Sequence, residues 1–332
     1  MAISYPEERV EMPLDLNENL LLPDRYYEGI IESLDFDLRS YPSPTALELK
    51  EKIAEHHGLK EEQIVVGNGS DAVLDTICKS FIHSRGTLGY FHPSYEMYSL
   101  FASRNERRSV EIPLNSDFTL PSPRDYLKEI DLLMICSPNN PSGLTVEKGK
   151  IESILDGDVL TVIDETYAEY TGEDNISLLK KYDNLILVRS FSKAWGLASI
   201  RVGYSISSAE KGLELLEDML PYNVNDLSIQ MAEAALERKD IVEKTINKTI
   251  EEREYLAMRL EERGFNTLPS DTNFLLCKPP DPIDISKLYH ELLERGIRIR
   301  TFEEPRLEDH VRITVGDEKI NEHLLMALDE IL

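Results

Sequence analysis

The stretch that decides the fold is "NLILVRSFSKAWGLASIR", residues 184–201. Its first seven residues are strand-length and apolar on both faces, which is typical of an inner strand in a buried parallel sheet. A serine-rich segment follows and carries Lys193, with Arg201 eight residues on, at the spacing of two helical turns. Lone lysines usually lie on surfaces, but a desolvated amine has a lowered pKa and can form Schiff bases. The placement of Lys193 therefore favours a functional role.

Apolar runs of the same kind precede this stretch and alternate with helical patterns. The predicted strands are 63–67, 87–91, 131–138, 159–164 and 184–190, and the clearest helices are 45–58 and 72–82. Gly58 supplies the expected stop of the first helix. This repeated strand–helix order predicts a three-layer α/β/α domain with a mostly parallel sheet.

The pattern changes from about residue 228, where helix formers continue to Gly264. Beyond it the sequence predicts strands at 272–278, 297–302 and 311–316, and helices at 285–296 and up to Leu332. We interpret this part as a smaller α+β domain. The predicted division is 30–235 for the large domain, and 1–29 together with 236–332 for the small one.

Charge and composition exclude several classes of partner. The chain has 62 acidic and 36 basic residues among 332, a net charge of −26, which disfavours nucleic acid and anionic membranes. It has neither an apolar run of the ~18 residues needed to span a bilayer nor a signal-peptide core, so a cytoplasmic protein is expected. Cys78, Cys136 and Cys277 lie in apolar runs and are expected to be reduced, and no metal site is predicted. The adjacent His56 and His57 favour a surface or capping role.

Three motifs follow predicted strands and could bind a ligand. "GNGSD" (67–71) stands before a helix, where glycines permit close approach and backbone amides attract anions. "VIDETY" (162–167) ends a strand in Asp164, and "CSPNNPSG" (136–143) presents Asn139 and Asn140. Each motif alone also fits a helix cap or a turn. Serine hydroxyls with an arginine suit a phosphate group, and such residues flank Lys193.

Taken in order, the motifs resemble the fold-type I aminotransferases that depend on pyridoxal phosphate, and most resemble the histidinol-phosphate aminotransferase family. The resemblance runs from "LDLNEN" through "YPSPTALELKEKIA", "GNGSD", "HPSYEMY", "CSPNNPSG", "DETY" and "SFSKAWGLASIR" to "VRITVG". The ordered set is specific, although no single motif is.

The resemblance implies a role for each residue at these motifs. Lys193 would form the Schiff base with pyridoxal phosphate and then move a proton of the substrate. Asp164 would pair with the pyridine nitrogen. The cofactor phosphate would be held by Ser190, Ser192 and Arg201 and by the backbone amides of Ser70 and Asp71, the phenolic oxygen by Asn140 and Tyr167, and the ring face by Tyr95. Tyr41 resembles a tyrosine that reaches the partner subunit's cofactor, which implies a homodimer.

The resemblance also implies a substrate set in the second domain. Arg312 resembles the arginine that grips the carboxylate or phosphate of the substrate, and Arg300 resembles a second phosphate-binding arginine. A structural ion pair is the alternative for Arg300 in so acidic a chain. Asn17 and Asn273 resemble residues that line the pocket. The expected reaction is histidinol phosphate with 2-oxoglutarate, giving imidazole acetol phosphate and glutamate.

Three departures from the family pattern concern the substrate pocket. First, Ser40 stands where the family has an arginine, so that Arg39 is displaced by one position. Second, the amino-terminal segment is short, and Tyr5 is not assigned to the place of the family's tyrosine there. Third, no proline follows Asn19. The alternatives are a threonine-phosphate decarboxylase and an aminotransferase for aromatic or acidic amino acids. A non-catalytic sensing module is a further alternative, but such modules are expected to carry a DNA-binding domain, and the net charge of this chain opposes DNA.

Overall fold

The apolar run before Lys193 forms β7 (Leu185–Ser190), an inner strand of a seven-stranded sheet. The computed structural model describes residues 10–122 and 127–332, so Tyr5 lies outside the described residues. Leu185 and Leu187 pack in the core on one face of the sheet, and Ile186 and Val188 pack on the other. This period of two explains why the run is apolar throughout.

The large sheet is mostly parallel, as predicted. Its strand order is β2-β8-β7-β6-β5-β3-β4, and only β8 runs against its neighbours. The strands are β2 (Ile64–Gly67), β3 (Thr87–His92), β4 (Arg108–Pro113), β5 (Leu132–Cys136), β6 (Leu160–Asp164), β7 and β8 (Gly203–Ile206). The sequence did not predict β4 or β8, because β4 is a largely exposed edge strand and β8 is short.

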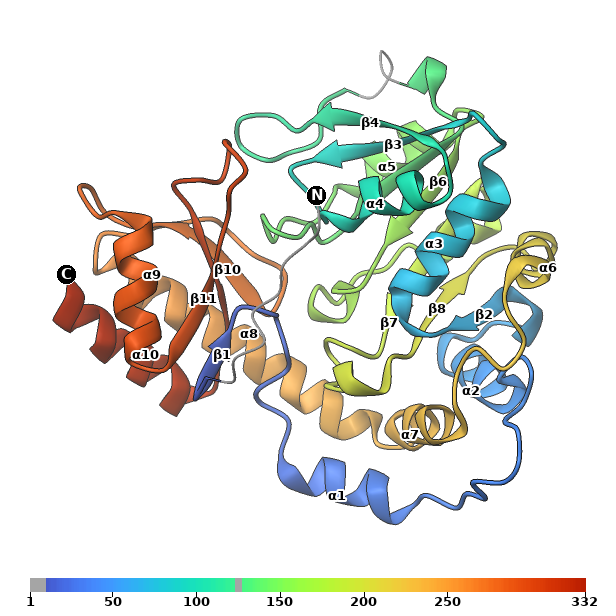
Figure 1. Ribbon diagram of the computed structural model, residues 1–332, viewed down its shortest axis with the longest axis horizontal. Helices are drawn as coiled ribbons and strands as arrows, with labels where there is room; N and C mark the ends of the chain where they lie inside the picture. Colours follow the sequence, from blue (N-terminus) through green and yellow to red (C-terminus); the bar gives the residue numbers. More distant parts are fainter. Residues whose placement is uncertain (1–9, 123–126) are drawn as a thin grey trace.

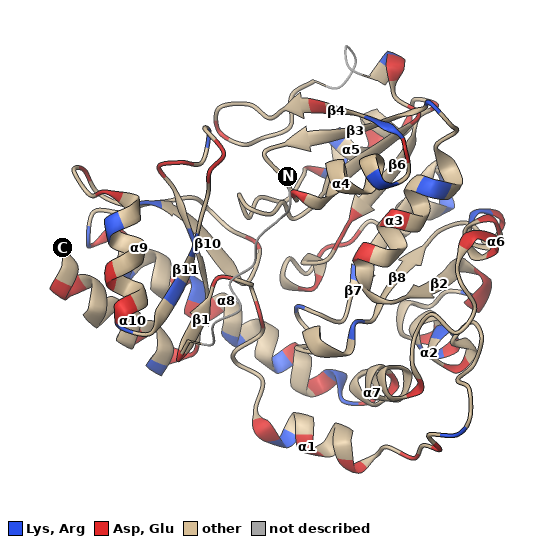
Figure 2. Ribbon diagram, in the orientation of Figure 1, with Lys and Arg blue, Asp and Glu red and all other residues tan. Residues whose placement is uncertain are grey.

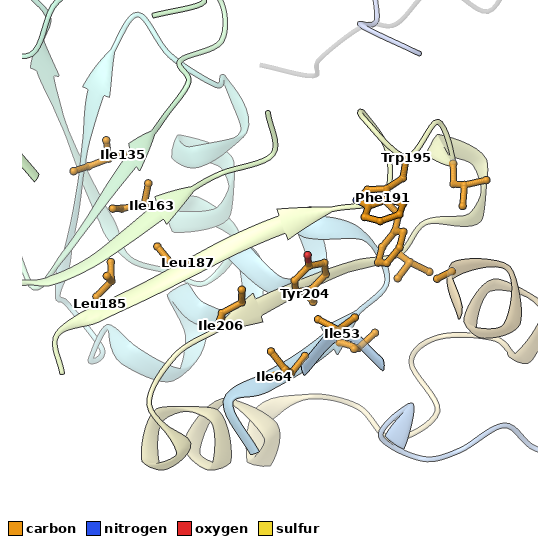
Figure 3. Close-up of a cluster of buried hydrophobic side chains, with 14 of the residues drawn as sticks. Ile53, Ile64, Ile135, Ile163, Leu185, Leu187, Phe191, Trp195, Tyr204 and Ile206 are labelled. Carbon is orange, nitrogen blue, oxygen red and sulfur yellow. The ribbon is translucent and has the colours of Figure 1, made fainter. Parts of the chain in front are cut away.

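Helices cover both faces of this sheet and complete the three predicted layers (Figure 1). One core holds side chains of α3 (Gly69–Phe81), α4 (Met97–Arg104) and α6 (Ala209–Asp218). The opposite core is shown in part in Figure 3. It holds side chains of α1 (Asp24–Glu32), α2 (Leu47–His57), α5 (Lys148–Leu155) and α7 (Asp226–Leu236).

A second sheet of five strands, in the order β1-β11-β12-β10-β9, builds the smaller part of the molecule. Its strands are β1 (Met12–Leu14), β9 (Asn266–Thr267), β10 (Phe274–Lys278), β11 (Ile297–Thr301) and β12 (Val311–Thr314). α9 (Ile285–Glu294) and α10 (Glu318–Ile331) pack with this sheet. The long α8 (Lys239–Glu261) links the two parts, since Val242 lies in the large core and Leu256 in the small one.

The expected domain boundary at residue 29 differs from the observed packing. It cuts through α1, whose buried Tyr26 and Ile30 both belong to the large core. α1 is amphipathic, and its buried face packs on the large core. Only the segment around β1, which pairs in parallel with β11, joins the small sheet.

Cysteine and histidine placement tests two further predictions. All three cysteines are free and buried, as expected. His56 and His57 both lie in the last turn of α2, as the prediction of a role at a helix end requires, and His56 is exposed. His57 is half-buried, and its Nε2 lies 2.9 Å from the hydroxyl of Tyr204. Figure 2 shows acidic residues on α1, α6, α7 and α10, at both ends of the molecule. None of the helices in residues 10–122 and 127–332 combines the length and apolar character that crossing a bilayer requires.

Candidate active site

The predicted strand-end motifs meet at one edge of the large sheet. β5, β6 and β7 run parallel, and β2 runs the same way because β8 is antiparallel to both β2 and β7. A cavity of ≈ 340 Å³ lies at this edge and is closed on its other side by the small sheet. Its walls bring together Asn17, Ser70, Asp71, Tyr95, Asn140, Asp164, Tyr167, Ser190, Ser192, Lys193, Arg201, Arg300 and Arg312.

Lys193 sits in a tight turn, not in a helix. The backbone N–H of Gly196, at φ +65°, donates to the carbonyl of Lys193 (2.9 Å), and Phe191 and Trp195 anchor the turn in the core. The eight residues from Lys193 to Arg201 therefore do not form two turns of a helix, as their spacing had suggested. The Lys193 Nζ donates to the carbonyl of Leu16 (2.7 Å). Burial, with a smaller effect of Arg312, lowers the pKa of Lys193 to about 8.

The start of α3 and the guanidinium of Arg201 form a cradle that a phosphate fits. Arg201 Nη1 lies 3.4 Å from Ser192 Oγ, and Nη2 lies 3.3 Å from Asp71 Oδ2. A Cβ at Gly69, where φ is +83°, would lie 2.6 Å from Arg201, and one at Gly203 would lie 2.2 Å from the amide nitrogen of Ser70. Only glycine permits this approach, which leaves the first amides of α3 facing the cavity edge.

Asp164, the last residue of β6, is buried and accepts three hydrogen bonds. They come from the Tyr98 hydroxyl (3.0 Å) and from the hydroxyl (2.6 Å) and N–H (3.1 Å) of Thr166. Burial raises the pKa of the Asp164 carboxyl. A buried carboxylate favours a cationic partner, so the site suits a protonated ring nitrogen. Sequence reasoning missed Tyr98 and Thr166, although an aspartate two residues before a threonine is a recognised local turn signal.

Tyr167, Asn140 and Arg312 line the same cavity. The Tyr167 hydroxyl accepts from Asn17 Nδ2 (2.9 Å), and burial raises its pKa. Arg312 donates to Asn140 Oδ1 and to the carbonyl of Asp15, and burial lowers its pKa to about 10. The neighbouring Asn139 instead donates from its Nδ2 to the Ser142 hydroxyl within the turn and to the carbonyl of Pro93, which follows β3. Asn140 is therefore the ligand-facing asparagine of the pair.

Tyr95 and Arg300 line the cavity through contacts with acidic side chains. The Tyr95 hydroxyl donates to Asp71 Oδ1 (3.0 Å). Arg300 forms an ion pair with Glu96 (3.1 Å), so the structural alternative considered for Arg300 is present alongside its place in the cavity wall. No sequence pattern predicts this role of Glu96, because the ion pair joins β11 to the start of α4.

Two predicted residues lie outside the cavity. Asn273 is buried, and its Nδ2 donates to the carbonyls of Asn17 (3.0 Å) and Glu18 (3.3 Å), so it supports the segment that carries Asn17. Tyr41 is 84% exposed and packs on Tyr222, with ring centroids 5.0 Å apart. Within one chain, Tyr41 therefore does not reach the cavity.

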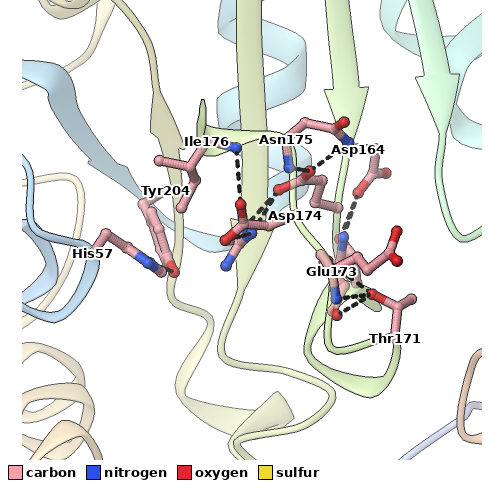
Figure 4. A network of polar contacts seen from close by, with 12 residues as sticks. His57, Asp164, Thr171, Glu173, Asp174, Asn175, Ile176 and Tyr204 are labelled. Atoms are coloured by element: carbon pink, nitrogen blue, oxygen red, sulfur yellow. Dashed lines mark hydrogen bonds and ion pairs between the residues drawn. The ribbon is translucent and has the colours of Figure 1, made fainter. Parts of the chain in front are cut away.

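A buried polar network lies one residue behind the strand ends (Figure 4). Glu165 follows Asp164 and accepts from Arg189, which precedes Ser190, at 2.8 and 2.9 Å. Asp174 lies 3.6 Å from the same guanidinium. The pair joins the ends of β6 and β7 and so supports the two cavity residues beside it. Among the described residues, no group of His, Cys, Asp and Glu could hold a metal ion.

A mostly parallel sheet whose strand ends present this lysine, carboxylate and phosphate cradle has the fold of the pyridoxal-phosphate-dependent transferases of fold type I. The chain belongs to the aminotransferase class I and II family, whose profile matches residues 11–328. It is therefore an aminotransferase, an enzyme that moves an amino group between an amino and a keto substrate.

Individual relatives are similar over almost the whole chain. A histidinol-phosphate aminotransferase of Pyrococcus furiosus is 38% identical over 325 residues, covering 96% of this chain and 92% of the relative. The crystal structure of a histidinol-phosphate aminotransferase from Clostridium acetobutylicum superposes with a TM-score of 0.87 at 25% identity, over 96% of this chain and 98% of that one. An L-threonine-O-3-phosphate decarboxylase from Porphyromonas gingivalis has the same fold, with a TM-score of 0.85 at 24% identity and coverage of 96% and 99%.

Proposed function

We propose that this aminotransferase transfers the amino group of histidinol phosphate to 2-oxoglutarate, with pyridoxal phosphate as cofactor. The observation that carries the substrate assignment is a pair of arginines. Arg300 and Arg312 stand opposite each other on β11 and β12 and line the cavity that contains Lys193. Two forked guanidinium groups side by side suit a phosphate or a second carboxylate. The names of the relatives agree with this assignment.

Pyridoxal phosphate, when bound, supplies an electron sink for the α-carbon of the substrate and carries the amino group between the two substrates. Its phosphate would be held by Ser190, Ser192 and Arg201 and by the backbone amides of Ser70 and Asp71. Its ring would be covered by Tyr95. Asp164 would accept a hydrogen bond from the ring nitrogen and keep that nitrogen protonated. Asn140 and Tyr167 would contact its phenolic oxygen.

Lys193 would attach the cofactor and then act as a general base and acid. Its lowered pKa leaves part of the amine neutral near pH 8, so its Nζ can take the proton from the α-carbon of the substrate. The small sheet and the segment 15–17 cover the cavity and exclude water from this step. Arg312 would bind one anionic group of the substrate, while Asn17 holds Tyr167 in place.

The proposal extends to the assembly. We infer a cytoplasmic homodimer in which Tyr41 reaches the cofactor phosphate of the partner subunit, which agrees with its exposure in one chain. The partners are small molecules, and the net charge of −26 argues against nucleic acid. We propose the division into residues 30–235 and residues 1–29 with 236–332, except that α1 belongs to the large domain because it packs on the large core, and that residue 235 lies in the last turn of α7.

A substrate panel tests the proposal. Purified enzyme with pyridoxal phosphate and 2-oxoglutarate is mixed separately with histidinol phosphate, threonine phosphate, aspartate, tyrosine and phenylalanine, and glutamate formation and carbon dioxide release are measured. We expect glutamate to form fastest with histidinol phosphate. Fast turnover of amino acids with no response to histidinol phosphate would contradict the substrate assignment. Carbon dioxide from threonine phosphate would identify a decarboxylase, and no turnover at all would support a sensing role.

A further inference from the structure

The ion pair between Arg300 and Glu96 bridges the two sides of the cavity. Arg300 comes from β11 of the small sheet, and Glu96 is the residue directly before α4 on the large domain. Arg300 Nη2 lies 3.1 Å from Glu96 Oε1, and both side chains line the cavity. Glu96 therefore occupies the approach to the arginine that the proposed function assigns to the substrate.

The two arginines have unequal freedom to change partners. Arg312 is buried and bound to Asn140 and to the carbonyl of Asp15. Arg300 lies opposite it in the strand register, with 24% of its side chain exposed. The Glu96 side chain is 46% exposed, so its carboxylate can move into water at little cost. Of the two arginines, Arg300 is thus the one whose partner is easily displaced.

Charge makes this displacement necessary when an anion arrives. The guanidinium groups of Arg300 and Arg312 repel each other, and the Glu96 carboxylate acts on Arg312 as well as on Arg300. With Glu96 in place, the three groups carry a net charge of +1. A phosphate that binds Arg300 would stand beside the Glu96 carboxylate, and like charges at that distance repel.

We propose that Glu96 is a specificity-determining residue, a built-in competitor that an anionic substrate group must displace from Arg300. This inference rests on the proposed function for the identity of the substrate. Its consequence is that Glu96 weakens the binding of anions at Arg300. Glu96 acts through Arg300 and touches no reacting atom, so its effect belongs in KM and in anion affinity.

The test is a double-mutant cycle on the holoenzyme with inorganic phosphate as the probe. Because bound cofactor fills the cradle at Arg201, the dissociation constant measured by calorimetry reports the second anion site. Glu96→Gln should lower this constant about three- to fivefold, the size expected for removing a partly exposed ion pair. Arg300→Ala should raise it about tenfold or more. In the Arg300→Ala background, Glu96→Gln should have a clearly smaller effect, because only the weaker action of Glu96 on Arg312 remains.

A matched control separates this contact from general charge. Glu304 also lines the cavity, but its carboxylate lies 3.3 Å from His92 and not on an arginine of the pair. Glu304→Gln removes the same charge and should change the phosphate constant less than Glu96→Gln does. In turnover, Glu96→Gln should lower KM for histidinol phosphate without lowering kcat, and should leave KM for unphosphorylated histidinol unchanged.

The outcomes distinguish the two proposals. Equal phosphate constants in the wild type and Glu96→Gln, or an effect of Glu96→Gln that is undiminished without Arg300, would overturn the role of Glu96 and leave the substrate assignment intact. If the phosphate constants change as expected but the enzyme does not turn over histidinol phosphate, the substrate assignment fails. The competition at Arg300 then applies to another anionic substrate.

Discussion

At the scale of single residues, Lys193 controls how the protein acquires its cofactor. The neutral amine is the nucleophile, and its pKa of about 8, in place of the usual 10.5, makes that form abundant above pH 8. We predict that the rate of pyridoxal phosphate incorporation into cofactor-free protein rises with pH, is half-maximal near pH 8 and is level above pH 9. The growth of visible absorbance in stopped-flow mixing measures this rate.

Two variants make the prediction specific. Lys193→Ala should remove covalent cofactor binding and transaminase activity while the far-UV circular dichroism stays unchanged. Arg312→Met should move the midpoint to higher pH, because Arg312 lowers the pKa of Lys193. A midpoint near 10.5 in the wild type would show that burial does not tune this amine.

The residues that sequence reasoning reached are those placed by a strand end. Asp164, Ser190 and Lys193 follow apolar runs, and parallel strands deliver their ends to one edge. Glu96, Tyr98 and Asp15 were missed because their roles depend on contacts between segments far apart in the chain. The resemblance placed Asn273 on the cavity wall, but its Nδ2 donates to the backbone carbonyls of Asn17 and Glu18 outside the cavity.

At the scale of elements, the close packing of β8 on the start of α3 keeps the phosphate cradle open. A Cβ at Gly203 would lie 2.2 Å from the backbone nitrogen of Ser70, so Gly203→Ala must push the start of α3 away. We predict that Gly203→Ala weakens the retention of pyridoxal phosphate about tenfold or more, measured by equilibrium dialysis. The matched control is Gly149→Ala in α5, where the new Cβ meets nothing within 4 Å. Retention of cofactor by Gly203→Ala equal to that of the control would contradict this view.

The ends of β6 and β7 depend on the buried pair of Glu165 and Arg189. Their side chains are 1% and 6% exposed, so removing one partner leaves a charge in a dry environment. We predict that Glu165→Gln lowers the free energy of unfolding by about 3–5 kcal/mol, measured in urea. Glu165→Met with Arg189→Met should cost less, because no unpaired charge remains and only the two hydrogen bonds from Asn175 to Glu165 are lost. Asp37→Asn breaks an exposed pair with Arg39 and should change little. A single and a double variant of equal stability would contradict the assignment.

Elements differ in how strongly the sequence specifies them. Strands buried on both faces carry unbroken apolar runs, and these were found. β4 lies at the sheet edge, where water can hydrogen-bond to the free backbone groups of the strand, and four of its first five residues are exposed. An exposed edge strand does not need the apolar run by which the inner strands are recognised. Strand β8 has four residues and begins two residues after Arg201, so its pattern is too short to separate from the turn before it.

At the scale of the whole molecule, the two cores explain why the chain was correctly expected to contain two kinds of architecture. The apolar pattern changes where the large core ends, and α8 contributes side chains to both cores.

The apolar pattern does not show on which of the two cores an amino-terminal segment packs. β1 pairs with β11 almost 300 residues later, while α1, only ten residues further along, packs on the opposite unit.

The exposed apolar side chains around Tyr41 argue for association of two copies. Leu38, Tyr41 and Leu220 are 82%, 84% and 77% exposed, and Tyr222 beside Tyr41 donates its backbone N–H to the carbonyl of Pro44. Such a patch on one chain marks a contact surface. We predict a dimer of twice the chain mass of 38.0 kDa in sedimentation equilibrium. Leu38→Asp with Leu220→Asp should shift it to monomer, because burying two new carboxylates at the contact is costly.

Activity should follow the association state if Tyr41 completes the cofactor site of the partner. The dissociated variant should lose at least about tenfold of its activity, and raising the protein concentration should restore part of it by mass action. Met326→Asp adds a charge at a residue that is 58% exposed on α10 of the small domain, and it should leave mass and activity unchanged. A wild-type monomer, or a fully active dissociated variant, would place the complete site within one chain and assign the patch around Tyr41 to another partner.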